Sequence, residues 1–448
     1  MKDGRTNPDG SDTTSLDTFF LETYGCTLNT SDSELIANIL EGLQLIRVDT
    51  VEDAAFIVIN TCGVKTPTEN KIFHQIEQYG KLQDKIVVIT GCLPLIHKAN
   101  LDAIMRLVPG FGALIGPKNY HELGAIIQEL RAGTRNIIKI DGTSLEEKIA
   151  LEPKRSHDHL GIIAIAEGCL GACNYCCTRF ARGPLMSYPA PVLASKFNAM
   201  IEDGVKEAWI TAEDCSAYID NENAVNLAGL LEAFLQQEGT YFIRIGMMNP
   251  KTLLPIRDHL IHAFHDDRVF KFIHVPVQSG SDRVLDDMNR RYTAADFKRI
   301  IQDFKVAFPT ITVATDVICG YPGESDDDFE ATMDLMRDIK PDVINISMYG
   351  HRPGTVASKL RQLPTEVVKD RSRKLTTLHK EITSQNNEGW IGWEGPAIID
   401  EFNSEKNNWV ARIPVYKPII VDHGTLGEFV RVRILGVHSY YFTGELID

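Results

Sequence analysis

Residues 167–183 read EGCLGACNYCCTRFARG and place four cysteines within nine positions. Cys169, Cys173 and Cys176 follow a C-x3-C-x2-C spacing, and Cys177 comes directly behind them. A structural zinc site favours four ligands in paired C-x2-C form, and no matching pair follows in the sequence. A [4Fe–4S] cube takes four ligands, so three cysteines leave one iron open to another molecule. The spacing therefore favours a cluster over zinc or inert thiols, with Cys177 outside the ligand set.

This stretch continues the apolar run LGIIAIAEGC, the first of six candidate strands between Leu160 and Tyr349. The other five are EAWITAED, YFIRIG, FKFIHVPV, ITVATDVICG and VINISMY, with helical stretches between them. Six strand–helix units favour a partial parallel (β/α)6 barrel over a flat sheet. Sites in parallel barrels lie at the carboxyl ends of the strands, so we expect the cysteines at that end.

A second set of cysteines lies nearer the start of the chain. Three predicted strands, LDTFFLETYGC, AAFIVINTC and KIVVITGC, end at Cys26, Cys62 and Cys92. Between the first two, SDSELIANILEGL predicts a helix that begins with a capping box of Ser31 and Glu34. Strand–helix alternation predicts a doubly wound α/β domain with a parallel sheet. The carboxyl ends of its strands meet at one edge, so we expect the three thiols to converge there.

The sequence pattern divides the chain into a tail, two α/β regions and a small β region. The predicted bounds are 1–15 for a disordered tail, 16–141 for the doubly wound domain, 142–159 for a charged linker, 160–385 for the partial barrel and 386–448 for a small all-β barrel. In the last region EFVRVRILGV alternates with a period of two residues, which is typical of a strand with one buried face. Arg431 and Arg433 are predicted on its outer face.

Basic residues gather in the polar helix before this small barrel and on the barrel itself. With Tyr416 they predict a surface that binds RNA phosphates and stacks bases, and the alternative is a solvated helix face. The residues assigned to this surface are Arg371, Arg373, Lys374, Lys417, Arg431 and Arg433. The formal net charge of −15 argues against nucleic-acid binding by the whole molecule but allows a local basic face.

The composition is that of a globular protein without a membrane span or a secretory signal. No apolar run reaches about 18 residues, and the polar N-terminal stretch lacks the apolar core of a signal peptide. Nine cysteines, an odd number without a signal, argue against a disulfide framework. We therefore expect a cytoplasmic protein with no membrane partner.

Seven motifs resemble, in order and spacing, the radical S-adenosylmethionine (SAM) methylthiotransferases. They are YGCTLNTSDSE, NTCGVK, TGCLP, EGCLGACNYC, HVPVQSGSDRVLDDMNRRY, TDVICGYPGES and RPGT. The small β-barrel resembles the RNA-binding TRAM module that completes this family. EGCLGACNYCCTRFARG, WITAED and IRIGMMNP are most similar to the archaeal and eukaryotic branch, which modifies N6-threonylcarbamoyladenosine beside the tRNA anticodon. The chain departs from that branch at TAEDCSAYID, where a Thr-Gly-Ala-Tyr-Gly run is commoner.

The resemblance implies two [4Fe–4S] clusters and SAM as cofactors. Cys169, Cys173 and Cys176, the barrel triad, would hold the cluster whose open iron binds SAM. The other three thiols, the N-terminal triad, would hold an auxiliary cluster. One-electron cleavage of SAM would give a 5′-deoxyadenosyl radical that takes hydrogen from C2 of the adenine at tRNA position 37. Sulfur from the auxiliary cluster, methylated by a second SAM, would then be delivered to that carbon. The implied partners are tRNA, an unidentified reductant and a sulfur source, and we expect a monomer.

Residues at the ends of the barrel strands are candidate SAM contacts. By the same resemblance, Glu213 would accept a hydrogen bond from the ammonium of SAM, and Asp214 competes for this role. Their alternative is a solvated loop. The other candidates, for the ribose, the carboxylate or the adenine of SAM, are Gln278, Ser279, Gly320 and Gly323. The two glycines would let the backbone approach the adenine closely.

Other polar residues in the barrel strands have structural interpretations. Arg244 and Asp316 lie within apolar strands, where a charge is costly unless paired, so a structural ion pair is as well supported as a substrate contact. Cys215 and Cys319 are predicted to be small core residues, and His274 a satisfied barrel residue.

Three alternatives to this function stay open. The first is a radical-SAM methylthiotransferase that acts on a different tRNA adenosine or on a ribosomal-protein side chain. The second is a two-cluster electron carrier, which predicts a fourth ligand for each cube, and the sequence supplies three at each. The third is an RNA-binding protein with zinc, which the paired triads oppose.

Overall fold

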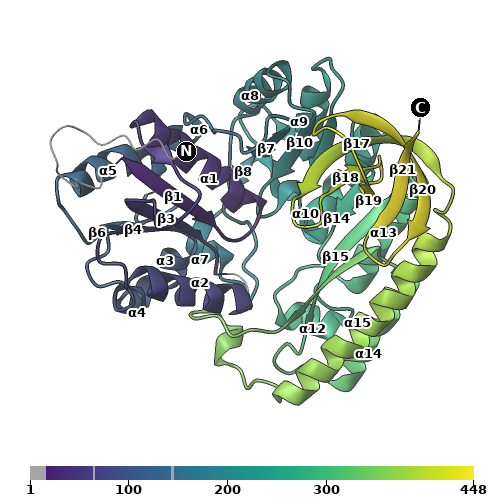
Figure 1. Ribbon diagram of the computed structural model, residues 1–448. Coiled ribbons are helices and arrows are strands. Elements are labelled where there is room, and N and C mark those ends of the chain that lie inside the picture. The colour runs from purple at the N-terminus through teal and green to yellow at the C-terminus, as the bar shows by residue number, and fades with distance from the viewer. Residues whose placement is uncertain (1–16, 64–65, 143–145, 448) are drawn as a thin grey trace. The chain divides into compact units, whose positions relative to one another are not determined.

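The computed structural model describes residues 17–63, 66–142 and 146–447 (Figure 1). The chain forms two compact units, Met1–Lys154 and Arg155–Asp448. The predicted tail at 1–15 and part of the predicted linker at 142–159 lie outside the described residues. The domain bounds themselves stay predictions. Among the described residues, no helix is long and apolar enough to cross a membrane.

The first unit is built on a parallel six-stranded sheet in the order β2-β1-β3-β4-β5-β6. The strands are β1 (Thr18–Thr23), β2 (Ile46–Arg47), β3 (Phe56–Thr61), β4 (Ile86–Gly91), β5 (Ala113–Ile115) and β6 (Ile137–Lys139). Its helices are α1 (Thr27–Gly42), α2 (Thr66–Tyr79), α3 (Leu93–Ile96), α4 (Asp102–Met105), α5 (Leu123–Arg131) and α6 (Glu146–Ile149). Residues of α1 and α5 pack in one hydrophobic cluster and residues of α2, α3 and α4 in another. The predicted doubly wound domain is confirmed.

Helix α1 begins earlier than the sequence pattern predicts. Cys26 is its N-cap, with extended backbone, and the prediction that Ser31 and Glu34 form a capping box is wrong because both are buried inside the helix. The polar residues of this helix face the strand ends: the Ser33 hydroxyl contacts the Thr23 hydroxyl at 2.7 Å. The polar residues that resemble a helix N-terminus in the sequence therefore lie within the helix and take part in packing.

The second unit contains the six predicted barrel strands, all in their expected places. They are β7 (Leu160–Ala164), β10 (Glu207–Thr211), β13 (Phe242–Ile245), β14 (Phe272–His274), β15 (Thr312–Cys319) and β16 (Val343–Met348). They form two parallel sheets, β13-β10-β7 and β14-β15-β16. The two sheets meet where the Met248 amide donates to the His274 carbonyl at 2.9 Å. The predicted partial barrel is confirmed.

Helices connect these strands in the (β/α) pattern. They are α8 (Ala190–Glu202), α9 (Leu227–Leu235), α11 (Arg257–Ala263), α13 (Ala294–Ala307), α14 (Asp326–Ile339) and α15 (Thr365–Glu388). Helix α15 starts beside the loop after β15, where Gly320 faces Val368. It ends beside the start of β16, where Asn386 donates to the Lys340 carbonyl at 3.1 Å. It therefore runs along the barrel from the carboxyl to the amino ends of the strands.

The C-terminal strands close into a small barrel in the order β17-β18-β19-β21-β20. They are β17 (Glu394–Asn403), β18 (Asn408–Arg412), β19 (Pro418–Val421), β20 (Phe429–Val437) and β21 (Phe442–Ile447). In β20, Val432 and Ile434 are buried in the hydrophobic core, while Arg431 and Leu435 are exposed. The predicted alternation is confirmed, and it places the basic side chains outside.

The small barrel packs against the amino ends of the parallel strands (Figure 1). The Lys271 amide, just before β14, donates to the Pro414 carbonyl at 2.8 Å. The His159 ring, just before β7, contacts the Asp400 carbonyl at 3.0 Å. Because cofactor chemistry in such barrels is placed at the carboxyl ends, the small barrel lies at the opposite end from the cysteine stretch.

Candidate active site

The cysteine stretch forms a loop between β8 (Ala166–Glu167) and α7 (Thr178–Arg182). The base of the loop is closed by a fully buried ion pair between Glu167 and Arg182 at 3.1 Å, and by the Cys169 amide, which donates to the Gly183 carbonyl at 3.2 Å. Gly168 has a φ of +70°, and a Cβ there would collide with the Pro184 carbonyl, so only glycine fits. The ends of the loop are thus fixed before any cofactor binds.

Each thiol of the barrel triad accepts a hydrogen bond from an N–H group. The Gly171 amide donates to Cys169 Sγ at 3.3 Å, and the Thr178 amide donates to Cys176 Sγ at 3.4 Å. Arg290 Nη1 donates to Cys173 Sγ at 3.4 Å. N–H donors stabilise thiolates and are the usual outer partners of iron–sulfur ligands. The residues present therefore fit a cluster held by three thiolates.

The fourth cysteine of the loop differs from the other three. Cys177 is buried and is the N-cap of α7, whereas the triad thiols are partly exposed. Burial raises the pKa of Cys169 to about 12 and also raises that of Cys176, so a cluster that bound here would have to displace protons from both. Within the described ranges, no group of three or more His, Cys, Asp or Glu side chains could hold a single metal ion as it stands.

Glu213 and Asp214, which follow β10, have different surroundings. Both oxygens of Asp214 are used: Oδ1 accepts from the Ser216 hydroxyl at 2.7 Å, and Oδ2 from the Thr252 hydroxyl at 2.8 Å. Glu213 is only partly buried, and its charge adds to the raised pKa of Cys176, which burial chiefly causes. Glu213 therefore lies near the barrel triad with a carboxylate that solvent can reach, and Asp214 is committed to the turn.

Gln278 and Ser279 sit at a strained turn after β14. Gln278 has a φ of +72°, and its backbone pairs with β15. The Ser279 hydroxyl is fully buried and faces Thr332 of α14 at 3.4 Å. The structure thus gives Ser279 a packing role, and Gln278 keeps the predicted place beside the strand ends.

The two glycines after β15, Gly320 and Gly323, have different surroundings. Gly320 has a φ of +78°, and a Cβ there would come within 2.5 Å of Val368, so this glycine lets α15 pack against the loop. Gly323 has a φ of +84° and open space where a Cβ would lie. Close approach of a cofactor therefore remains a prediction for Gly323, whereas packing accounts for Gly320.

The N-terminal triad lies at the carboxyl edge of the six-stranded sheet. Cys26 caps α1, Cys62 directly follows β3, and Cys92 directly follows β4. The Asn29 side chain lies beside two of these thiols: its Oδ1 accepts from Cys26 Sγ at 3.7 Å and from Cys92 Sγ at 3.9 Å. A Cβ on Gly25 would lie 2.7 Å from Cys62 Cβ, so the β1–α1 turn passes close to Cys62, the third cysteine of the triad. The structure brings the three cysteines together at one edge.

Two residues near the thiols were not predicted from the sequence. Asn29 lies three positions after Cys26, and its Nδ2 also donates to the Tyr24 and Thr61 carbonyls at 2.8 and 2.9 Å. Arg290 lies beside Arg291 in the run MNRRY, where the first arginine is buried and the second is exposed. Both residues lie within motifs that carry the resemblance described above, but no pattern in the sequence tells which arginine faces inward.

The charged residues within the barrel strands have structural partners. Asp316 accepts from the His274 ring at 2.8 Å and from the Asn345 amide at 2.7 Å. The Arg244 guanidinium lies over the rings of Trp209 and Tyr416. The predicted satisfied histidine is confirmed, and the two charges are not paired with each other.

The residues predicted to bind RNA divide into buried and exposed groups. Arg371 is buried in an ion pair with Glu324 at 2.6 Å, and Lys417 in one with Asp342 at 2.7 Å, so both are removed from the predicted surface. Their charges hold α15 and the small barrel to the partial barrel. The exposed group is Arg373, Lys374, Arg431 and Arg433.

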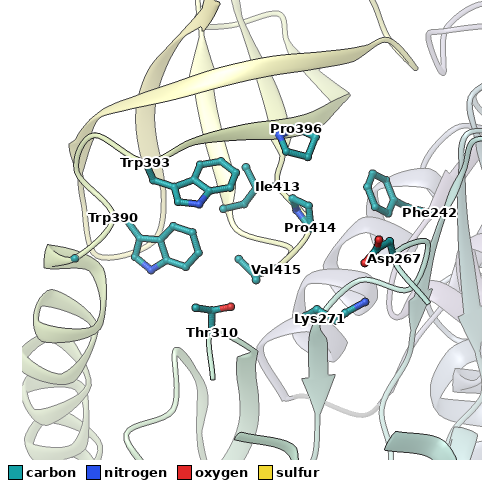
Figure 2. Close-up of a pocket in the computed structure, with 11 residues that line it drawn as sticks. Phe242, Asp267, Lys271, Thr310, Trp390, Trp393, Pro396, Ile413, Pro414 and Val415 are labelled. Carbon is teal, nitrogen blue, oxygen red and sulfur yellow. The ribbon is translucent and has the colours of Figure 1, made fainter. Parts of the chain in front are cut away.

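A pocket of about 720 Å³ lies between the partial barrel and the small barrel (Figure 2). Trp390 and Trp393 line one side, and Phe242 and Lys271 line the other. Lys271 Nζ is engaged by the Asp266 and Val269 carbonyls, both at 2.8 Å. Since the partial barrel contributes to this pocket only from the amino ends of its strands, the pocket is separate from the barrel triad.

Three family models match the chain, one to each predicted folded region. They are "Uncharacterized protein family UPF0004" at residues 18–111, "Radical SAM superfamily" at 163–336 and "TRAM domain" at 392–447. The first covers the N-terminal triad, and the second covers the barrel triad.

Curated relatives resemble the chain over nearly its whole length. A Pyrococcus horikoshii protein and a Methanothermobacter thermautotrophicus protein, each named "Probable threonylcarbamoyladenosine tRNA methylthiotransferase", are 38% and 36% identical. These matches cover 96% and 95% of this chain and 99% of each relative. A Homo sapiens protein named "Threonylcarbamoyladenosine tRNA methylthiotransferase" is 31% identical over 98% of this chain and 76% of its own length.

Solved structures with low sequence identity share the fold. The radical SAM methyltransferase TsrM from Kitasatospora setae, described with tryptophan and a SAM analogue bound, gives a TM-score of 0.56 at 12% identity. The match covers 76% of this chain and 74% of that one. The cobalamin-dependent radical SAM enzyme OxsB, with SAM bound, gives 0.51 at 11% identity over 82% of this chain and 56% of its own.

Proposed function

This chain belongs to the threonylcarbamoyladenosine tRNA methylthiotransferases, and from that membership we propose that it converts N6-threonylcarbamoyladenosine in tRNA to its 2-methylthio derivative. The target is the adenosine at position 37, on the 3′ side of the anticodon, and the reacting atom is C2 of its base. The observation that carries the proposal is the similarity of 31–38% identity over 95–98% of the chain to relatives named for this one activity.

The barrel triad would hold a [4Fe–4S] cluster with one open iron. When bound, this cluster supplies the single electron that cleaves SAM, which makes the inert C2–H bond reactive. The chain's own part is to keep three thiolates in place through the N–H groups of Gly171, Thr178 and Arg290. Glu213 would accept a hydrogen bond from the ammonium of SAM; support comes from its partly exposed position near Cys176 and from the hydrogen bonds that commit Asp214 to the turn.

The N-terminal triad would hold the auxiliary cluster that carries the sulfur. Asn29 supports this role because its side chain contacts two of the three thiols while its amide is anchored to the backbone of β3 and of the β1–α1 turn. An anchored polar side chain that contacts ligand atoms fixes the orientation of those ligands.

The small barrel and α15 would bind the tRNA backbone. Support comes from the TRAM match and from the exposed basic side chains of Arg373, Lys374, Arg431 and Arg433. Phosphate contacts of this kind carry affinity without reading sequence.

Mass analysis of digested tRNA tests the proposal. The anaerobically reconstituted full chain is incubated with SAM, a low-potential reductant and tRNA that contains N6-threonylcarbamoyladenosine. We expect this nucleoside to gain a methylthio group and other adenosines to stay unchanged. A methylthio group on another adenosine, or none on tRNA and one on a ribosomal protein, would overturn the substrate assignment.

A further inference from the structure

Arg290 is a buried cation in contact with a predicted cluster ligand. It follows α12 (Asp282–Asp287) and is 8% exposed. All three guanidinium nitrogens donate: Nε to the Tyr292 hydroxyl at 2.8 Å, Nη2 to the Pro276 carbonyl at 3.0 Å and Nη1 to Cys173 Sγ at 3.4 Å. Its position is therefore fixed by two neutral oxygen acceptors and one thiol.

The guanidinium of Arg290 forms no salt bridge within the described residues; its charge acts on the buried Asp214 only at longer range, where it partly offsets the rise that burial gives to the pKa of Asp214. Other buried arginines do form a salt bridge: Arg182 pairs with Glu167 and Arg371 with Glu324. A buried charge without a counter-ion is strongly unfavourable. Of its three acceptors, the Cys173 sulfur is the one that would ligate iron in the proposed cluster, so the guanidinium charge lies directly against that site.

The segment around Arg290 is also tied to the rest of the cysteine loop. The Asn174 amide donates to the Met288 carbonyl at 3.0 Å, and the Asn289 side chain donates to the Ala172 carbonyl at 2.7 Å. These bonds join the residues after α12 to the loop on both sides of Cys173. The distance between the guanidinium and the Cys173 sulfur is therefore fixed by bonds between the two segments, as well as by the Arg290 side chain itself.

We propose that Arg290 is a positioning residue that holds the Cys173 sulfur in place as a cluster ligand and raises the reduction potential of the cluster in the barrel triad. This inference rests on the proposed function, because it needs that cluster. Reduction by a low-potential one-electron donor adds one electron, and so one negative charge, to a site that already carries three thiolates. A cationic donor bonded to a ligand sulfur stabilises the reduced form more than the oxidised form. Loss of Arg290 therefore makes reduction harder.

A redox titration monitored by electron paramagnetic resonance tests this proposal. The full chain carries Cys26→Ala, Cys62→Ala and Cys92→Ala, so that the signal comes from the barrel triad alone. Arg290→Met, Arg290→Lys and the matched control Arg291→Met are compared with this parent. Arg291 is the adjacent arginine, and its side chain is 64% exposed. We expect a more negative midpoint potential in Arg290→Met, a smaller shift in Arg290→Lys and no shift in Arg291→Met.

Iron content separates this proposal from the proposed function. If the parent holds no iron, or if Cys169→Ala leaves its iron content unchanged, the cluster assignment fails. If Arg290→Met retains its iron and its midpoint potential equals that of the parent, the role of Arg290 is overturned while the cluster stands. Iron loss in Arg290→Met but not in Arg290→Lys supports the role, because charge is retained only in the lysine variant. Iron loss in both variants, with the helical circular dichroism unchanged, contradicts it, since shape would then matter more than charge.

Discussion

Glu213 and Asp214 are neighbouring carboxylates with opposite expected phenotypes. Glu213→Gln keeps the shape of the side chain but removes the charge that would face the ammonium of SAM, so we expect weaker SAM binding with little change in unfolding. Asp214→Asn weakens the bonds to Ser216 and Thr252, because it replaces one carboxylate acceptor with an NH2 donor that faces a hydroxyl donor, so we expect a loss of stability of about 1–3 kcal/mol. Equilibrium dialysis with SAM and thermal unfolding of both variants measure the two effects.

The reverse outcome would exchange the two roles. If Asp214→Asn lost SAM binding at full stability while Glu213→Gln bound normally, the predicted SAM contact would lie at the wrong carboxylate. A matched control is Glu222→Gln, because this exposed carboxylate belongs to the same barrel but not to the strand ends.

Cys177 provides a second test at the level of single residues. It caps α7 and is buried, so Cys177→Ala removes one small side chain and no cluster ligand. We expect about 1 kcal/mol of destabilisation and an unchanged iron content. Iron analysis of the reconstituted variant checks this, and loss of one cluster would mean that the ligand set includes Cys177.

Single residues could be predicted where chemistry depends on spacing along the chain. The barrel triad was visible because three ligands fall within eight positions, and the N-terminal triad because each cysteine ends an apolar run. Arg371 and Lys417 could not be placed, because only the fold shows their carboxylate partners, which lie far away in the sequence. Arg290 could not be separated from Arg291 for the same reason.

Among the elements, β10, β17 and β18 share a buried charged cluster where the two barrels meet. Glu207 at the start of β10 accepts from Trp209 Nε1 at 2.5 Å, and Arg412 of β18 donates to Asp400 of β17 at 2.5 Å. Two guanidinium groups lie over the Tyr416 ring, that of Arg412 at 4.8 Å and that of Arg244 at 5.2 Å from the ring centre. This cluster explains why Arg244 tolerates a place within an apolar strand.

The cluster makes stability depend on pH. Burial, with the nearby Asp400 charge, raises the pKa of Glu207 from 4.5 to about 7, and the pKa of Asp400 is also raised by burial. The folded chain therefore holds protons that the unfolded chain has released, so the free energy of unfolding falls as pH rises from about 4.5 to about 7. The groups that face Glu207 are Asp400, Arg412, Arg244 and Tyr416, with His159 at the Asp400 carbonyl.

Glu207→Gln is the variant that tests this dependence. We expect it to gain stability relative to the wild type at pH 8 and to gain less, or none, at pH 5, because the amide keeps the neutral form at both values. Urea unfolding at the two pH values measures the difference. Equal effects at both values would contradict the raised pKa, and Glu238→Gln, at an exposed carboxylate just after α9, is the control.

Elements were predicted well where apolar periodicity is strong. The six barrel strands and the alternation in β20 follow directly from the pattern of buried residues. The start of α1 could not be predicted in this way. The polar run that resembles a helix N-cap lies inside the helix and packs against the ends of the strands. Helix boundaries depend on such tertiary contacts, which a local pattern does not contain.

Across the whole second unit, exposed basic residues mark both ends of the barrel. Arg373 and Lys374 lie in the first half of α15, near the loop after β15, and Arg431 lies on the small barrel at the other end. About fourteen residues of α15 follow Lys374, which span roughly 21 Å at 1.5 Å per residue. If tRNA binds the small barrel, we therefore expect the part of the tRNA in contact with the small barrel to lie far from the nucleotide that reacts.

Removing the small barrel is a poor test of RNA binding, because it would expose Glu207, Arg244 and Phe242. Arg431→Glu changes an exposed charge without touching this interface. We expect weaker tRNA binding and a log–log salt slope smaller by about 0.7 to 0.9, which corresponds to one lost phosphate contact. A salt series of tRNA binding measures both. Arg299→Glu on α13 is the control for charge, and equal losses in the two variants would argue against a defined surface on the small barrel.

The central claim is that two cysteine triads in one chain divide the reaction between them. The most direct measurement quantifies 5′-deoxyadenosine and methylthio nucleoside from the same anaerobic reaction with SAM and tRNA. It compares the wild type with Cys173→Ala and Cys62→Ala. The account predicts both products from the wild type, neither from Cys173→Ala, and 5′-deoxyadenosine alone from Cys62→Ala. Methylthio nucleoside from Cys62→Ala, or 5′-deoxyadenosine from Cys173→Ala, would contradict it.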